Sequence, residues 1–305
     1  MIDAPREVHL AIIRKRFPGI SLAEMTLEAG GEHYVYVVNE SIVFRFPQEP
    51  GPIPLVRPHA IAWLAATNAI PFALPTCEIE HDAEFGVWFE RARYLPGVPF
   101  VPAVAATFSG DEMLTVARQM GDFLTTLHAL PLEPARALGM NEMGPADFWD
   151  YMENNPNAYP WVRRTLWPVL PPEERAWVAG LFERFIAQAK QTPLTLVIRH
   201  NDMQPCHIIV DSESHTLSGV IDFFWRIADP ASDFKAFEHY GPEFVAEVYA
   251  LYGGTVDPGF EARRLFYTGH DVVFRLVRSY AAGDAGLIAR FRTELKDYIR
   301  AHPIA

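Results

Sequence analysis

The sequence predicts an α+β protein of two lobes, a small lobe built on an antiparallel β-sheet and a larger, mainly helical lobe. Residues 22–95 contain short β-rich runs separated by turn residues, whereas apolar residues recur at helical spacing from about residue 108 onward. The length of 305 residues suits one bilobal domain or two domains with cores of ordinary size. We therefore place the two lobes at 1–95 and 96–305.

The net charge of the chain indicates which classes of binding partner to expect. Lys and Arg number 26 and Asp and Glu number 38, so the formal net charge is −12. Broad nucleic-acid binding needs clustered Lys and Arg, so we expect no nucleic acid partner. The acidic balance would suit a cationic small molecule, although most acidic proteins are simply soluble.

The chain shows no sign of export or membrane insertion. Its first residues lack the apolar run and the small-residue cleavage site of a signal peptide. No stretch of about 18 apolar residues occurs, and the two cysteines, Cys77 and Cys206, cannot build a disulfide-rich fold. We expect a cytoplasmic protein with no membrane contact and no obligate protein partner.

The small lobe is expected to combine four strands with two helices. In the first expected strand, Tyr34–Val38, large residues occupy every position, which predicts that the strand is buried on both faces. A turn at 39–41 would join it to the second strand, and a proline-rich connector at 47–58 would follow. The expected strands are Tyr34–Val38, Ile42–Phe46, Cys77–His81 and Phe85–Glu90, and the expected helices are 5–17 and His59–Asn68. Arg91–Pro102 would then link the lobes.

The larger lobe is expected to be helical except for one segment. Ser109 and Glu112 mark a helix start, and a second helix is predicted at 172–190. Three short apolar runs interrupt this pattern and predict strands at Leu194–Ile198, His207–Val210 and Leu217–Phe223. From about residue 232 the sequence is again mostly helical.

Three polar residues lie at the ends of these short runs. Asp202 follows the first run, His207 opens the second and Asp222 ends the third. Because loops converge where strands end, we expect these side chains to lie close together. One carboxylate can orient or deprotonate a hydroxyl, and a second carboxylate with a nearby donor can hold a metal that carries phosphates. The spacing is typical of the phosphoryl-transfer site of protein kinases.

The same segment resembles the aminoglycoside phosphotransferase-like kinases, whose pattern is H-G-D-x-x-x-x-N followed by I-D and D-P-x-x-D. The matching residues are His200-Asn201-Asp202, His207, Ile221-Asp222, Asp229-Pro230 and Asp233. Asn201 replaces the usual Gly and also tolerates unusual backbone angles. His207 replaces Asn, as is common in the 2″-aminoglycoside and macrolide branches. Further likeness at 30–47 and Leu127–Pro131 extends the resemblance to roughly residues 20–300.

The resemblance implies a bilobal, protein-kinase-like fold and a transfer reaction. The γ-phosphoryl group of ATP or GTP would move, with the help of Mg²⁺, to a hydroxyl of a small molecule. Asp202 would be the catalytic residue that orients the hydroxyl and accepts its proton. His207 and Asp222 would be the metal ligands, although imidazole is a less usual ligand of Mg²⁺ than oxygen.

The resemblance also assigns the nucleotide contacts. Gly30 and Gly31 would belong to the nucleotide loop, and Arg45 would contact the phosphates where many kinases use Lys. Two departures stand out: Ala60 takes the position of the acidic residue that normally pairs with this cation, and Phe224 takes a position that is often Gly. An alternative hypothesis is therefore a catalytically degenerate kinase fold that binds a nucleotide or sugar.

The acceptor site is less well defined by the sequence. Glu238 and Asp271 are the candidate substrate-binding residues, because both would face the acceptor cleft in the resembling enzymes. A polycationic aminoglycoside would need many carboxylates, whereas a macrolide would need apolar walls such as the aromatic residues at 148–167, which core packing also explains. We predict an aminoglycoside-like or macrolide antibiotic as acceptor, and a metabolic amino alcohol or sugar as the alternative.

Overall fold

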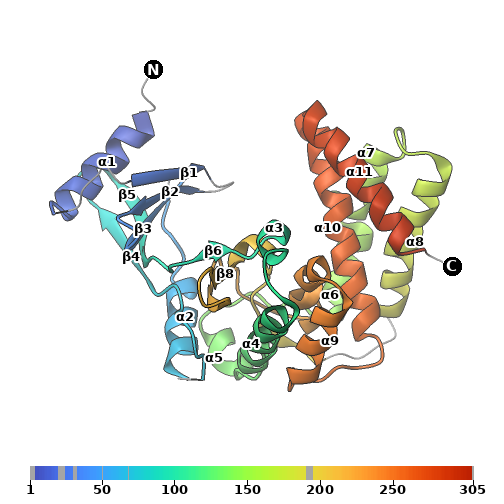
Figure 1. Ribbon diagram of the computed structural model, residues 1–305. Coiled ribbons are helices and arrows are strands. Elements are labelled where there is room, and N and C mark those ends of the chain that lie inside the picture. The colour runs from blue at the N-terminus through green and yellow to red at the C-terminus, as the bar shows by residue number, and fades with distance from the viewer. Residues whose placement is uncertain are drawn as a thin grey trace.

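Figure 1 shows the computed structural model, in which a small lobe at the N-terminus is followed by short central strands and a column of helices that ends at the C-terminus. The structure describes residues 4–19, 25–29, 33–49, 51–67, 69–189 and 195–303. Two hydrophobic clusters organise these residues, one within the small lobe and one running through the larger lobe. The predicted two-lobed α+β architecture is confirmed.

A five-stranded antiparallel sheet forms the small lobe, in the order β1-β2-β3-β5-β4. Its strands are β1 (Met25–Ala29), β2 (His33–Val38), β3 (Ile42–Pro47), β4 (Cys77–Asp82) and β5 (Val87–Arg93). β5 extends into the predicted linker because it keeps pairing with β3 and β4. The register of β3 against β5 places Arg45 opposite Glu90. The four predicted strands are present, together with β1, which the sequence analysis missed.

Helix α1 (Ala4–Arg16) completes the core of the small lobe. Its residues Ile12 and Ile13 are fully buried in the same cluster as the sheet. The sheet contributes mostly alternate residues, because successive side chains of a strand point to opposite faces. These residues are Tyr36, Val38, Phe44, Phe46 and Phe89. The expectation that β2 is buried on both faces is wrong, since Val35 and Val37 are only partly buried.

Helix α2 (Val56–Ala66) connects the sheet to the larger lobe. It begins at Val56 rather than His59, because Pro58 is tolerated in the first turn of a helix. Its buried residues Ala60, Ile61 and Leu64 belong to the cluster of the larger lobe, not to that of the sheet. Figure 1 accordingly shows α2 below the sheet, next to α5 (Leu132–Ala137) and α4 (Gly110–His128) of the larger lobe.

Helices make up most of the larger lobe, and α10 packs against α7, α8 and α11. They are α3 (Pro102–Ala105), α4 (Gly110–His128), α5 (Leu132–Ala137), α6 (Pro145–Asn154), α7 (Tyr159–Leu166), α8 (Pro172–Ala189), α9 (Pro242–Leu251), α10 (Phe260–Ala282) and α11 (Ala285–Ala301). α4 starts as predicted, with Ser109 and Glu112 forming a reciprocal capping box. Within the described residues, no helix combines the length and apolar character needed to cross a bilayer.

Short strands and 3₁₀ segments carry the candidate site. β7 (Val197–Arg199) pairs with β10 (Arg226–Ala228), while β8 (Ile208–Asp211) lies between β6 (Val98–Pro99) and β9 (Thr216–Val220). The 3₁₀ segments are η2 (Pro205–His207) and η3 (Pro230–Tyr240). β9 ends at Val220 rather than Phe223, because the chain turns sharply at Asp222, whose φ is 64°. β10 was not predicted, since three residues carry too little pattern.

Candidate active site

One buried carboxylate holds the loop that carries Asp202. Asp233, in η3, accepts hydrogen bonds from the backbone N–H groups of His200 at 2.7 Å and Asn201 at 3.1 Å. Nε2 of His128, at the end of α4, lies 3.3 Å from the same carboxylate. Asn201 has a φ of 70°, a backbone conformation that is uncommon for residues other than Gly. The loop conformation is therefore fixed by groups outside the loop.

His200 is fully buried and ties this loop to the segment after β9. Its Nδ1 accepts a hydrogen bond from the N–H of Asp202 at 3.2 Å, and its Nε2 donates to the carbonyl oxygen of Ile221 at 2.9 Å. Burial lowers the pKa of His200 to about 4, so the ring is neutral near neutral pH. A neutral imidazole can accept a hydrogen bond at one nitrogen and donate one at the other. His200 is thus a structural residue of the site.

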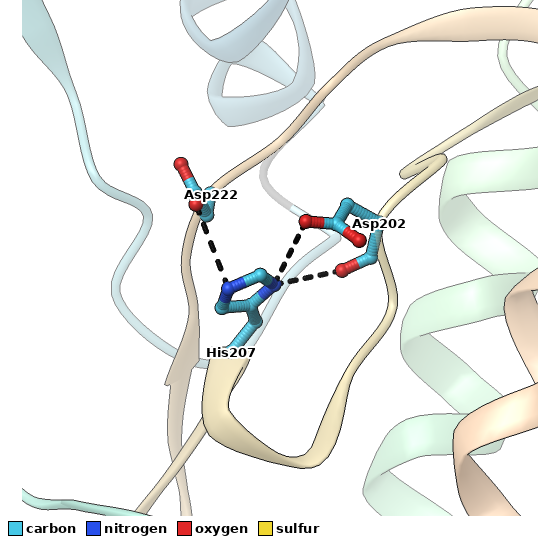
Figure 2. A group of neighbouring side chains, drawn as sticks. All are labelled: Asp202, His207 and Asp222. Carbon is cyan, nitrogen blue, oxygen red and sulfur yellow. Dashed lines mark hydrogen bonds and ion pairs between the residues drawn. The ribbon is translucent and has the colours of Figure 1, made fainter. Parts of the chain in front are cut away.

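Asp202, His207 and Asp222 meet as the sequence predicts. Figure 2 shows the ring of His207 between the two carboxylates. Nδ1 of His207 donates to the carbonyl oxygen of Asp202 at 2.8 Å and lies 3.5 Å from Oδ2 of Asp202, while Nε2 lies 3.5 Å from Oδ2 of Asp222. One potential ligand atom from each residue lies within 4.8 Å of the others. This spacing is compact enough for one metal ion.

The three residues differ in their proton affinity. Burial would raise the pKa of Asp222, but neighbouring cations outweigh it and lower the pKa to about 2. Burial is the main reason that the pKa of Asp202 is raised. Burial would lower the pKa of His207, but Cys206 and the carbonyl of Asp202 outweigh it and raise the pKa to about 9. In this arrangement Asp222 is ionised and His207 is protonated near neutral pH.

Two arginines, one on β3 and one on α2, reach Asp222. Nη2 of Arg45 lies 2.9 Å and Nη2 of Arg57 lies 3.5 Å from the same oxygen, Oδ1. Nη1 of Arg57 also lies 3.5 Å from Oε2 of Glu90. Sequence reasoning missed Arg57 and Glu90. Arg57 stands among prolines before the predicted helix start, and the place of Glu90 depends on a strand register that no motif specifies.

Two further predicted features have different outcomes. Gly30 and Gly31 lie outside the described residues. The side chain of Phe224, which takes a position that is often Gly, is 59% exposed and is not packed into the interior. Its neighbour Trp225 is buried instead.

Both predicted acceptor residues are engaged in ion pairs within the protein. Oδ2 of Asp271 lies 2.6 Å from Nζ of Lys235 and accepts a hydrogen bond from Gln204 at 3.2 Å. Burial would raise the pKa of Asp271, but Lys235 outweighs it and lowers the pKa. Oε2 of Glu238 accepts a hydrogen bond from Nη1 of Arg264 at 3.0 Å. Asp271 therefore lies beside the loop of Asp202, which it contacts through Gln204, whereas Glu238 is paired with Arg264 of α10.

The donor set fits a divalent metal with Asp222 as its anchor. Mg²⁺ prefers oxygen ligands, which the carboxylates of Asp222 and Asp202 provide. His207 directs Nε2 toward Asp222, because its Nδ1 is already bonded to the loop backbone. Imidazole is a less usual ligand of Mg²⁺ than a carboxylate oxygen, so His207 is the weaker ligand.

Sequence comparison identifies the family. Residues 25–266 match the model of the APH phosphotransferase enzyme family. The chain belongs to this family. The matched range contains the sheet of the small lobe and every residue of the site described above except Asp271, and it confirms the resemblance to aminoglycoside phosphotransferase-like kinases. The protein is accordingly a small-molecule kinase.

Solved structures of this family share the fold of the chain. The GDP and kanamycin complex of APH(2″)-IIIa aligns with a TM-score of 0.81 at 22% identity, over 96% of this chain and 99% of that chain. A type I macrolide 2′-phosphotransferase aligns with a TM-score of 0.68 at 20% identity, over 96% and 98%. The macrolide 2′-phosphotransferase MphH from Brachybacterium faecium gives 0.62 at 21%, over 97% and 98%. No curated protein matches the chain by sequence.

Proposed function

We propose that this protein is a Mg²⁺-dependent kinase that transfers the γ-phosphoryl group of ATP or GTP to a hydroxyl of a small molecule. The observation that carries the proposal is the convergence of Asp202, His207 and Asp222 within 4.8 Å. A module that only binds a nucleotide or sugar needs no carboxylate at the position of Asp202, so the geometry favours an enzyme. In this proposal residues 1–95 hold the donor, and residues 96–305 carry the catalytic loop and the acceptor.

The residues of the site have different roles in this proposal. Asp202 orients the acceptor hydroxyl and takes its proton as the hydroxyl oxygen attacks the γ-phosphorus, while the bond from that phosphorus to the β–γ bridging oxygen breaks and the nucleoside diphosphate leaves. The raised pKa of Asp202 makes it a better base. Asp222 and His207 would hold Mg²⁺, which neutralises and orients the phosphates when bound. Arg45 lies beside Asp222 and stabilises the charge that develops on the transferred group.

For the acceptor, structural likeness to aminoglycoside and macrolide phosphotransferases supports an antibiotic hydroxyl. The charges favour a molecule with few positive groups, because Asp271 already pairs with Lys235 and Glu238 with Arg264. A polycation would have to displace both of these built-in cations. Most of the aromatic cluster at 148–167 packs in or against the core and therefore does not form an apolar wall for a macrolide. A neutral sugar or an amino alcohol is the second candidate.

The proposal is tested by phosphoryl transfer with Mg²⁺ and with ATP and GTP in separate reactions. The acceptors are aminoglycosides, macrolides, sugars and simple amino alcohols, and the product is detected by mass. We expect one acceptor class to gain one phosphate. Asp202→Asn should lower kcat at least about a hundredfold while the Kd of the nucleotide is retained.

A matched variant separates catalysis from a general effect of the substitution. Asp297→Asn makes the same change at an exposed carboxylate of α11 and should leave kcat unchanged. A loss of less than about a hundredfold in Asp202→Asn would show that Asp202 is not the base. Nucleotide binding without transfer to any acceptor class would instead favour the degenerate kinase fold.

A further inference from the structure

Four charged side chains form a network of ion pairs beside the site. The two guanidinium groups come from β3 and α2, and the two carboxylates come from β5 and the segment after β9. Arg45 and Arg57 converge on one oxygen of Asp222, and Arg57 also faces Glu90. The side chains of Arg45 and Arg57 are 16% and 19% exposed, and that of Glu90 is 4% exposed. The two arginines are therefore held at the inner edge of the site and do not extend into solvent.

The acidic partner in this network comes from a different element than the family pattern predicts. Ala60, at the expected acidic position of α2, is fully buried and has no charge to offer. Glu90 on β5 stands opposite Arg45 in the sheet and faces Arg57 from α2. The helix thus supplies a cation and the sheet supplies the acid. This exchange leaves the site with two arginines where a single cation was expected.

The position of these arginines suits a polyphosphate. A metal held by Asp222 would lie close to both guanidinium groups and would repel them, unless anionic ligands balance the charge. The phosphates of a metal–nucleotide complex provide that balance, and the planar guanidinium fork matches phosphate oxygens. Nε of Arg45 and Nε of Arg57 are buried without a hydrogen-bond acceptor among the described residues, so neither group is saturated by protein contacts.

We infer that Arg57, positioned by Glu90, is a second polyphosphate-binding residue of the donor site. The inference rests on the proposed function, because it assumes a metal–nucleoside triphosphate as the donor. Arg57 and Arg45 together favour the metal–triphosphate complex over the free metal ion. The same two charges contribute little to a nucleoside monophosphate, which places no phosphate beside Asp222.

The test measures binding rather than turnover. The Kd values of Mg-ATP, Mg-GTP, ADP and AMP are measured by calorimetry, and the Kd of Mn²⁺ alone by electron paramagnetic resonance. Arg57→Gln should weaken triphosphate binding by about tenfold or more, with a smaller effect on ADP and almost none on AMP. The same variant should bind Mn²⁺ alone more tightly than the wild type, because one positive charge beside Asp222 is gone.

Three further variants separate positioning from a general loss of structure. Glu90→Gln should raise the KM of the triphosphate at unchanged kcat, and Arg57→Lys should recover part of the affinity. Arg6→Gln alters an exposed arginine of α1 and should change nothing. A purely structural role for Arg57 would weaken binding of Mn²⁺, AMP and ATP alike.

The outcomes distinguish this inference from the proposed function. Unchanged triphosphate affinity in Arg57→Gln, or an equal loss for AMP and ATP, would overturn the inference and leave the kinase proposal intact. A wild-type protein that binds Mn²⁺ but no nucleotide would overturn both.

Discussion

The proposed donor side and the proposed acceptor side of Asp202 use charge in opposite ways. On the donor side, Asp222 is 37% exposed and faces Arg45 and Arg57, whose charges a bound polyphosphate can satisfy. On the acceptor side, Asp271 is 25% exposed and is neutralised by Lys235 within the protein. The donor side thus presents positive charge to a ligand, whereas the charged groups of the acceptor side are largely paired with one another. This difference explains why the reaction is easier to infer than the acceptor.

The largest expected effect falls on the residue that supports both sides. Asp233 holds the loop of Asp202, and it lies in η3, which also carries Lys235. Asp233→Ala leaves the N–H groups of His200 and Asn201 without their buried acceptor, so unfolding in urea should show a loss of about 3–5 kcal/mol. Asp297→Ala, at an exposed ion pair, should cost less than about 0.5 kcal/mol. Equal effects would mean that the loop is held by other contacts.

The second effect is a pH dependence of stability that originates at His200. The pKa of His200 is about 4 in the folded protein and 6.5 for an unperturbed histidine, so between these values the unfolded chain binds a proton that the folded chain does not. Stability is therefore fully present above about pH 6.5 and falls as the pH drops toward 4, by up to roughly 3 kcal/mol. Unfolding free energies at both ends of this range should differ less in His200→Gln than in the wild type. An identical pH slope in both proteins would contradict this account.

The contrast between the two sides also marks what the sequence can predict. Asp202, His207 and Asp222 were predicted because their spacing along one short segment determines their proximity. Glu90 could not be predicted, since its position opposite Arg45 requires the register of β3 against β5.

The ion pair of the acceptor side and two short strands were not predicted, because both depend on contacts with other segments of the chain. The pairing of Lys235 with Asp271 requires the packing of η3 on α10, which no local pattern encodes. β1 and β10 were missed because such short strands are stabilised by their partners rather than by their own sequence. By contrast, the start of α4 was predicted, because the capping box of Ser109 and Glu112 is local.

The third effect tests whether Asp271 is a structural residue or an acceptor ligand. Lys235→Met leaves a largely buried carboxylate without its cation and should lower the free energy of unfolding by about 1–3 kcal/mol, measured in urea. Adding Asp271→Leu should restore most of this stability, because an apolar pair can replace a buried ion pair. If the double variant also keeps its transfer activity, Asp271 is structural. Loss of transfer at restored stability would return Asp271 to the acceptor site.

The smallest effect is expected at Phe224, which follows Asp222 by two residues. Its backbone connects the segment after β9 to the catalytic loop: its N–H donates to the carbonyl of His200 at 2.9 Å, and its carbonyl accepts from Nδ2 of Asn201 at 3.2 Å. These bonds do not involve the exposed ring, so Phe224→Ala should change the free energy of unfolding by less than about 0.5 kcal/mol. The Kd of Mg-ATP should also stay unchanged, since the donor side is defined by Arg45 and Arg57. Weaker binding of Mg-ATP would place the ring on the donor side and contradict the separation of the two sides, whereas a raised KM for the acceptor alone would assign the ring to the acceptor side.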